Sequence, residues 1–291
     1  MNQHALGIHR DDHGVVTLTL RQDRPVVVLD RALLESIDSA MDEITRDGTP
    51  NGFVLASDSR VFVAGADLKE IMALDDDALL DYLAFGQRVF GRISSLDCTS
   101  VAAINGAALG GGLEIAMHCD RLIGATPGDK AYLVGLVEAG LHICPGWGGA
   151  NMLPARIDPA EAIRQTAMGR AMKVDAAFEA GLIEELTEPD RLLERAQESA
   201  RSPRGDRTGV KHPRCVSDAD VTNAVRDAVA SVEADLPKTE AACGVVGLVR
   251  AGVEGTWEDG LRAERETLTR LRHTEQATAA IEAFFAKSAK A

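Results

Sequence analysis

The order of apolar and polar positions predicts that strands and helices alternate through the first half of the chain. Residues 15–20 and 52–56 are short apolar runs of the kind that form buried strands. Between them, from Arg31 to Arg46, apolar side chains recur at helical spacing. The same alternation continues with a helical pattern over residues 76–95 and strands at 101–104 and 121–125. We therefore predict an α/β protein with a largely parallel sheet.

Later helices are marked mainly by their ends. Asp158 followed by Pro159 is a typical helix start, and Gly169 is a typical stop. Asp175 and Gly181 repeat this combination. The periodicity weakens over residues 200–235, which are charged and rich in turn-forming residues.

Three consecutive segments follow from this pattern. Residues 1–199 are predicted to form the α/β core, residues 200–235 a charged linker or mobile loop, and residues 236–291 a helical C-terminal region.

Charge and composition exclude several classes of function. The net charge of −14 comes from 31 basic against 45 acidic residues and disfavours nucleic acid as a partner. The least polar stretch, residues 100–117, is too short to span a membrane and contains Asn105 and Glu114. The first residues show no basic cluster followed by an apolar run, so we expect no secretory signal.

Cysteine and histidine usage points to a reducing environment without a metal centre. The five cysteines are odd in number and form no C-x-x-C pair, which favours a cytoplasmic location. The seven histidines show no paired-ligand spacing. We therefore expect no bound metal.

Residues 104–116 carry the clearest chemical signal. A predicted strand runs into the glycines Gly110, Gly111 and Gly112, and these open a helix that contains Glu114. Glycines let a ligand approach the backbone, and the first N–H groups of a helix bind negative charge. An alternative is close packing of strand against helix without a ligand. The spacing fits neither a phosphate-binding loop nor a dinucleotide-binding fingerprint.

Two further elements join strands to helices through small residues. The segment 63–70 leads from an apolar run through Gly65 to Lys69, at the start of a predicted helix. The glycine-rich turn 144–149 follows Glu138. Each of these elements is a weak signal when taken alone.

Taken together and in this order, these elements resemble the enoyl-CoA hydratase/isomerase (crotonase) family. The resemblance covers most of residues 15–185 and resumes near Gly247. It rests on residues 64–70, 105–116 and 119–120, Glu138 with its P-G-x-G-G turn, residues 180–183, and the tail 283–287. It implies a spiral of strand-strand-helix repeats, followed by C-terminal helices that build trimers, often paired into hexamers.

The resemblance also implies the groups that would carry out catalysis. Addition of water to a 2-enoyl thioester places negative charge on the thioester oxygen and needs both a base and an acid. By motif, the backbone N–H groups of Ala66 and Gly111 form the oxyanion hole. Glu114 is assigned to activating the water, and Glu138 to the proton on the α-carbon.

The substrate-binding residues follow from the same resemblance. Coenzyme A would enter as part of an acyl-CoA substrate, and no separate cofactor is expected. The adenine edge is expected against backbone near the first motif, with phosphates near two lysines. The implied substrate-binding residues are Ala64, Asp67, Leu68, Lys69, Gly110, Gly146 and Lys287.

Several positions depart from the family pattern. Val27 stands where many relatives carry Asn, and His142 and Trp147 are bulky where small residues are common. Residues 150–151 read Ala-Asn in place of a frequent Thr-Gln. The connection from Glu114 to Glu138 is longer than in many members, with its extra residues around 126–129. These departures bear on the choice of acyl group more than on the class of reaction.

The expected activity is that of a stand-alone enoyl-CoA hydratase in fatty acid β-oxidation, because both glutamate positions are acidic. Family isomerases usually retain only the second glutamate. Double-bond isomerisation is the first alternative, followed by dehydration or thioester hydrolysis. A protein of this fold that binds acyl-CoA or RNA without catalysis is the alternative from a different class.

Overall fold

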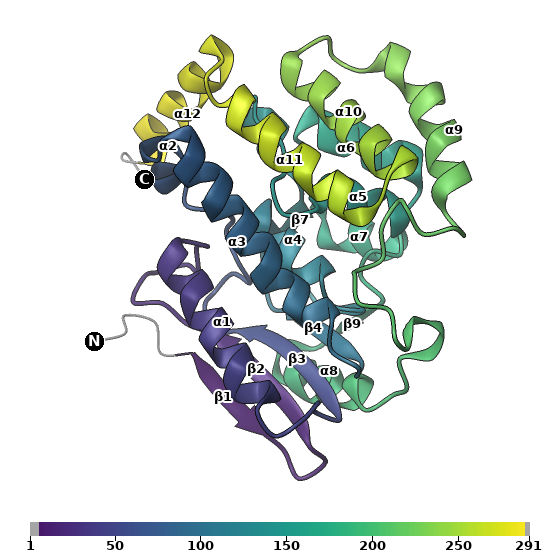
Figure 1. The fold of residues 1–291 in the computed structure, drawn as a ribbon. Coiled ribbons are helices and arrows are strands. Elements are labelled where there is room, and N and C mark those ends of the chain that lie inside the picture. Colours follow the sequence, from purple (N-terminus) through teal and green to yellow (C-terminus); the bar gives the residue numbers. More distant parts are fainter. Residues whose placement is uncertain (1–5, 289–291) are drawn as a thin grey trace. The chain divides into compact units, whose positions relative to one another are not determined.

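In the computed structural model, which describes residues 6–288, the chain divides into two compact units (Figure 1). The first unit contains the residues up to Ala66 together with Phe85–Val134 and Met172–Arg214. The second contains Asp67–Ala84, Gly135–Ala171 and the residues from Cys215 onward. Both units are discontinuous, unlike the three consecutive segments predicted from the sequence, because elements distant along the chain pack together in each.

A six-stranded sheet forms the centre of the first unit. Only its first strand is antiparallel to its neighbour, and the remaining neighbours are parallel. The predicted parallel sheet is therefore confirmed. The strands, in their order across the sheet, are β1 (Gly7–Arg10), β2 (Val15–Leu20), β3 (Gly52–Ser57), β4 (Ser100–Ile104), β6 (Arg121–Ala125) and β9 (Glu185–Thr187).

A smaller sheet combines β5 (Ala108–Leu109), β7 (Leu133–Gly135) and β8 (Met172–Lys173). Isolated bridges extend this pairing, joining Leu29 to Ala66 and Val63 to Ala108. Each of β2, β3 and β4 is thus followed by a short paired segment and then by a helix. This repetition supports the crotonase-like α/β fold, and the spiral arrangement itself stays a prediction.

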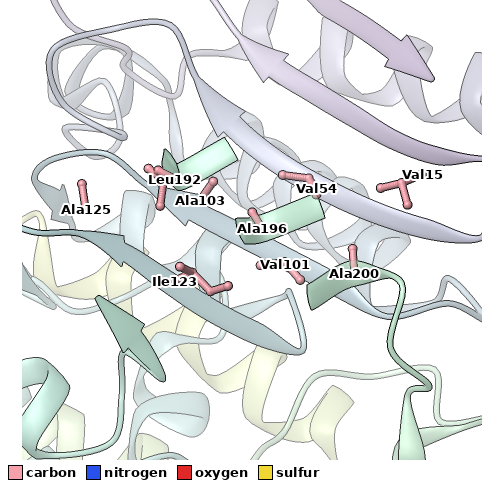
Figure 2. Close-up of a cluster of buried hydrophobic side chains, with 9 residues drawn as sticks. All are labelled: Val15, Val54, Val101, Ala103, Ile123, Ala125, Leu192, Ala196 and Ala200. Atoms are coloured by element: carbon pink, nitrogen blue, oxygen red, sulfur yellow. The ribbon is translucent and has the colours of Figure 1, made fainter. Parts of the chain in front are cut away.

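One face of the six-stranded sheet packs against α8 (Leu192–Ala200). Because successive strand residues point to opposite faces, every second side chain contributes to this cluster. Figure 2 shows valine, isoleucine and alanine side chains from four strands meeting the apolar side of α8. The buried residues of the cluster are Val15, Val54, Val101, Ala103, Ile123, Ala125, Leu192, Ala196 and Ala200. Burying each valine or leucine side chain stabilises the fold by about 1.5–3 kcal/mol.

Helix α1 (Arg31–Thr45) forms where the sequence predicts it. The Asp30 side chain caps its start by accepting a hydrogen bond from the N–H of Leu33 at 2.8 Å. Its buried side chains recur three or four residues apart, so they form one apolar stripe. Figure 1 shows α1 and α8 on opposite sides of β2 and β3. The remaining helical segments of the first unit are the second half of α3 (Asp76–Ser94), α4 (Gly111–Met117), α7 (Val174–Glu179), η3 (Pro189–Arg191) and η4 (Gly205–Arg207).

A buried arginine holds the segment after α8 against the first unit. The side chain of Arg204 is 3% exposed and pairs with Asp120 at 3.0 Å. Its guanidinium also donates to the carbonyl oxygens of Leu96, Val210 and Ser94. Residues 201–210, predicted to be part of a linker or mobile loop, are therefore anchored by a charged network.

The second unit is helical. Its elements are α2 (Leu68–Ala73), the first half of α3 (Asp76–Ser94), η1 (Glu138–Leu141), α5 (Gly149–Met152), η2 (Leu153–Ala155), α6 (Pro159–Met168), α9 (Thr222–Val232), η5 (Glu233–Asp235), α10 (Glu240–Glu254), α11 (Trp257–Leu271) and α12 (Glu275–Ser288). The predicted helical C-terminal region is confirmed. The prediction of a linker was wrong for α9, which buries Val225, Val229 and Val232 and packs against α6 and α10.

The two predicted helix starts had different outcomes. Asp158 caps α6 by accepting from the N–H of Glu161 at 2.9 Å, and Gly169 ends the helix in the left-handed region. The second prediction was wrong by two residues. Lys173 is the capping residue of α7, and Asp175 lies within its first turn, where an acidic side chain suits the helix dipole.

Within residues 6–288, no helix combines the length and apolar character that crossing a membrane would require. None of the five cysteines, all of which lie in this range, forms a disulfide, and only Cys243 is exposed. Burial raises the pKa of the Cys98 thiol to about 12, and the nearby Asp120 carboxylate adds to this effect. A neutral thiol is a poor nucleophile, so Cys98 should be unreactive near neutral pH.

We predict that Ellman's reagent titrates a single cysteine in the folded protein at pH 8, because four of the five thiols are buried. Substitution Cys243→Ser should abolish this reaction. Unfolding in guanidinium chloride should expose the remaining thiols and serves as the control. Fast reaction of the folded Cys243→Ser variant would contradict the burial of the other four.

Candidate active site

The segment that leads to Ala66 runs between two other pieces of the first unit. On one side, Ala64 donates its N–H to Val27 at 2.8 Å, and Leu29 donates to the carbonyl of Gly65 at 2.8 Å. These bonds flank the bridge between Leu29 and Ala66. In such a ladder, backbone groups alternate between the two neighbours. The N–H of Ala66 is therefore directed away from Leu29.

The other neighbour of this segment is the backbone that ends in Gly110. Val63 is bridged to Ala108, and Leu109 donates its N–H to the carbonyl of Val63 at 3.2 Å. Gly65 approaches so closely that a Cβ placed on it would lie 3.2 Å from the carbonyl oxygen of Leu109. The N–H of Ala66 thus faces the side on which the chain continues towards Gly111.

Helix α4 begins at Gly111 after a sharp reversal at Gly110, whose φ of 51° favours a residue without Cβ. The carbonyl of Gly110 accepts from the N–H groups of Leu113 and Glu114, at 2.8 and 3.0 Å. Gly111 is the first helical residue, where a helix supplies no acceptor for the N–H. The sequence-predicted pair, Ala66 and Gly111, therefore lies on two adjacent backbone segments.

Gly112 permits the contact that joins α4 to the strand segment. A Cβ at this position would lie 2.3 Å from the carbonyl oxygen of Val63 and 2.9 Å from its carbonyl carbon. Both are backbone atoms, so no side-chain rotation could relieve the overlap. A side chain here would push α4, and with it the N–H of Gly111, away from Val63.

Glu114 lies in the first turn of α4 and is 1% exposed. The helix dipole favours negative charge at this end of a helix. Because bulk water does not reach the carboxyl group, proton transfer from it would be to a group held within the site. Its burial suits the predicted role and does not by itself assign one.

The connection between α4 and η1 contains a tyrosine that packs into the first unit. The Tyr132 hydroxyl lies 2.9 Å from the carbonyl oxygen of Ala125 and 3.3 Å from that of Ile104. Burial raises the pKa of Tyr132, and Asp175 adds to the shift. Tyr132 therefore stays protonated and joins this connection to the ends of β4 and β6.

In the second unit, α2 begins immediately after Ala66. The Asp67 carboxylate caps it by accepting from the N–H groups of Lys69 and Glu70 at 3.0 and 3.3 Å. The ammonium group of Lys69 lies 5.9 Å from the centre of the Phe285 ring of α12, within the range of a cation–π contact. Lys287, on the last turn of α12, is exposed. The predicted phosphate-binding lysines thus lie on two neighbouring helices (Figure 1).

Glu138 opens the single turn η1 in the second unit. Its Oε2 atom is buried, although the residue as a whole is only half-buried. The carbonyl of Glu138 accepts from the N–H of Ile143 at 3.2 Å. His142 ends the turn with φ 57°, in the left-handed region, which costs roughly 1–2 kcal/mol for a residue with a Cβ.

A buried carboxylate that the sequence analysis did not identify holds the glycine-rich turn. Glu264 of α11 is fully buried and accepts from the N–H of Gly148 at 2.6 Å. It also accepts from the N–H of Ala150 and from the side-chain amide of Asn151, both at 3.1 Å. These donors lie at the start of α5, where a carboxylate is also favoured by the helix dipole. No local pattern marks Glu264, because its partners lie more than a hundred residues away.

Apolar side chains pack against the same turn. Gly146, a predicted substrate-binding residue, is buried where a Cβ would lie 2.9 Å from Leu268 and 3.0 Å from Leu83. Trp147 is 1% exposed and stacks edge-to-face on Tyr82, with 5.7 Å between ring centres. The bulky Trp147 therefore fills the interior of this unit.

The predicted site residues thus fall into two groups. Ala64, Ala66, Gly110, Gly111 and Glu114 belong to the first unit, and Ala64 is exposed. Asp67, Leu68, Lys69, Glu138, Gly146 and Lys287 belong to the second. The structure describes each group separately, so the pairing of the two glutamates stays a prediction.

Comparisons with known proteins converge on one family. The family model for enoyl-CoA hydratase/isomerase matches residues 10–242. YngF of Bacillus subtilis (strain 168), described only as a candidate enoyl-CoA hydratase/isomerase, is 35% identical over 192 residues, 66% of this chain and 72% of its own.

Solved structures share the fold over nearly the whole chain. An enoyl-CoA hydratase from Bacillus anthracis has a TM-score of 0.61 at 24% identity, covering 97% of this chain and 96% of its own. An enoyl-CoA isomerase from Mycobacterium tuberculosis also has a TM-score of 0.61, at 21% identity, covering 86% and 96%. The predicted resemblance is confirmed.

We predict that Gly112→Ala lowers the free energy of unfolding by about 1–3 kcal/mol, because its Cβ would overlap the backbone of Val63. Urea denaturation measures this change. Gly128→Ala is the matched control: a Cβ there meets nothing within 4 Å, and we expect a change within about 0.5 kcal/mol. Equal stability of the two variants would contradict the close approach at Gly112.

We also predict that Glu264→Gln destabilises the protein by about 1–3 kcal/mol, because the amide nitrogen would face N–H donors that now bond to a carboxylate. Thermal unfolding followed by circular dichroism measures the loss. The exposed Glu266 on the same helix provides the control, and Glu266→Gln should change stability by less than about 0.5 kcal/mol. A neutral Glu264→Gln would refute the role assigned to the carboxylate.

Proposed function

Because the chain belongs to the enoyl-CoA hydratase/isomerase family, we propose that it adds water across the 2,3 double bond of 2-enoyl-CoA thioesters. Membership of this family supports the assignment of the protein as an enzyme that acts on acyl-CoA. We choose hydration over isomerisation because both glutamate positions of the family are acidic in this chain, at Glu114 and Glu138. Hydration needs a group that activates water and a group that protonates carbon, which two carboxyls can provide.

The thioester oxygen would accept hydrogen bonds from the N–H groups of Ala66 and Gly111. Support comes from the direction of the Ala66 N–H and from the position of Gly111 at the start of α4. Such donors stabilise the charge that develops on the oxygen when the β-carbon is attacked, and removing one typically lowers kcat by about 10²–10³. Being backbone groups, they are oriented before the substrate binds.

Glu114 would take a proton from the water that attacks the β-carbon, and Glu138 would give a proton to the α-carbon. The burial of the Glu114 carboxyl and of the Glu138 Oε2 atom supports proton transfer within the site rather than to bulk water. After the addition Glu114 is protonated and Glu138 is ionised, so one proton would have to pass from Glu114 back to Glu138 before the next turnover. The overall reaction then consumes neither acid nor base.

The nucleotide part of coenzyme A needs local positive charge on this acidic chain. Lys69 and Lys287 would supply it, with Ala64, Ala66, Asp67 and Leu68 at the adenine edge. The exposure of both lysines on α2 and α12 supports the assignment. The reaction moves only water and protons, so we propose that neither metal nor redox cofactor takes part.

We further propose that the protein assembles as a homotrimer or a dimer of trimers. Its proposed role is in fatty acid β-oxidation, and its proposed location is cytoplasmic. Phe284, 44% exposed on α12, supports association because an exposed aromatic ring favours a covering surface. Isomerisation of a 3-enoyl-CoA is the second candidate. It is supported by the combined hydratase/isomerase description of the family and of YngF, and it would need only one of the two glutamates.

We predict that Glu114→Gln and Glu138→Gln each lower kcat for 2-enoyl-CoA hydration by about 10²–10⁴, because each removes a positioned proton-transfer group. The Kd for a saturated acyl-CoA should change little. Loss of absorbance at the conjugated double bond measures turnover, and calorimetry measures binding.

The double variant separates the alternatives. If the two groups act together, it should be far less impaired than the product of the single effects. Isomerase activity that survives Glu114→Gln, with faster shift of a 3-enoyl double bond than hydration in the wild type, would overturn the hydratase proposal. Unchanged turnover in both single variants would refute the catalytic assignment.

A further inference from the structure

Helix α2 and its capping residue Asp67 carry three of the residues proposed to bind coenzyme A, and little in the helix itself fixes its position. It is six residues long, whereas an isolated helix needs about 12–15 residues to be even marginally stable in water. Of these six residues, all of which lie within the described range 6–288, only Ile71 is buried. The position of α2 must therefore depend on contacts that other elements make with it.

Arg272, the residue that caps the C-terminal end of α11, makes such contacts. Its Nη1 atom donates to the carbonyl oxygens of Ile71 and Leu74, at 2.6 and 2.7 Å. Both acceptors lie at the C-terminal end of α2, where carbonyls lack partners within the helix and the helix dipole favours positive charge. Arg272 therefore holds the backbone of α2 and does not rely on its side chains.

The same guanidinium also binds the start of α3. Its Nη2 atom donates to the Asp76 carboxylate, and a ring nitrogen of His273 lies 2.7 Å from the same carboxylate oxygen. The hydrogen bonds from Arg272 and His273 lower the pKa of Asp76, so the carboxylate stays ionised near neutral pH. Arg272 is thus bonded to both ends of the connection between α2 and α3.

The surroundings of Arg272 are unfavourable for a charged side chain. The side chain is 3% exposed, and its Nε atom is buried without a hydrogen-bond partner among the described residues. Removal of a guanidinium from water is costly, and an apolar residue of similar volume often gives equal or greater stability. The planar fork of an arginine, in contrast, fixes several acceptors in one geometry. The arrangement therefore favours a role for Arg272 in placing α2 over a role in stability.

We propose that Arg272 is a positioning residue for coenzyme A, which holds α2 in the orientation in which Lys69 meets a phosphate of the nucleotide. The proposal rests on the proposed function, which places Lys69 at that phosphate. The Lys69 ammonium group also lies 5.9 Å from the ring centre of Phe285 on α12, and α12 begins three residues after Arg272. The corner between α11 and α12 thus contacts both ends of α2.

Calorimetry with free coenzyme A tests the proposal without requiring turnover. Arg272→Met keeps an unbranched side chain and removes the donors. We expect it to raise the Kd for coenzyme A about 5–20-fold, because α2 would occupy the binding position for only part of the time. Arg272→Lys keeps the charge without the planar fork and should recover part of the affinity. The exposed Arg270 on the last turn of α11 is the matched control, and Arg270→Lys should leave the Kd unchanged.

A truncated substrate separates positioning from general damage to the enzyme. For crotonyl-CoA, Arg272→Met should raise KM to a similar extent as the Kd and leave kcat within about threefold of the wild type. The crotonyl thioester of N-acetylcysteamine lacks the nucleotide, so its kcat/KM should stay within about threefold of the wild type. Equal losses on both substrates would indicate a merely structural role and would overturn the proposal.

Hydrogen exchange shows whether α2 is released. Amide exchange over residues 68–74 should be faster in Arg272→Met than in the wild type, whereas exchange in α10 should be unchanged. If Arg272→Met loses protection throughout the chain, the same measurements on Arg272→Lys decide. Unchanged exchange in α2 would contradict the proposal, as would an unchanged Kd in both Arg272 variants or a wild type that does not bind coenzyme A.

Hydration of crotonyl-CoA by the wild type is measured separately. Its absence would contradict the proposed function, whereas coenzyme A binding and hydrogen exchange would still decide the role of Arg272.

Discussion

Helix α4 can lie against the Val63 segment only because residue 112 has no side chain. The carbonyl oxygen of Val63 would be 2.3 Å from a Cβ there, and the same carbonyl accepts the N–H of Leu109. This contact joins the two backbone segments that carry Ala66 and Gly111. Two N–H groups from separate parts of the chain are thereby held on one side of a ladder. In the proposed oxyanion hole, these backbone groups would need no rearrangement when charge develops on a bound oxygen.

In the second unit, a buried charge rather than a glycine holds a backbone segment in place. The turn after Glu138 contains backbone N–H groups that have no partner in the turn itself. Glu264 supplies two carboxylate oxygens to them from α11, and Gly146 and Trp147 of the same turn are buried. A buried carboxylate is stabilised only when its oxygens are satisfied in this way. The position of the glycine-rich turn 144–149 therefore depends on a residue that is remote from it in sequence.

Local signals predicted much of the fold. The short apolar runs and the helical spacing in α1 were sufficient to predict the parallel sheet and its first helix, and Asp158 with Gly169 marked both ends of α6. The prediction that Asp175 caps α7 was wrong because an acidic residue is favoured both at the capping position and within the first turn of a helix. Helix α9 was not predicted because its sequence contains many polar and charged residues. Its three valines are buried through tertiary contacts with α6 and α10, which the sequence does not show. Motif order, rather than periodicity, predicted the candidate site, whereas Glu264 and Tyr132 carry no local signature.

The most direct test of the paired N–H groups is the carbonyl stretch of a bound, unreactive acyl-CoA, measured by infrared difference spectroscopy with a ¹³C label at the thioester. Two donors at Ala66 and Gly111 should polarise the carbonyl and move its band to lower frequency than in free ligand. Gly111→Pro removes one N–H at a position that a helix tolerates for proline, and should reverse part of the shift. A bound band at or above the frequency of the free thioester would contradict the oxyanion hole.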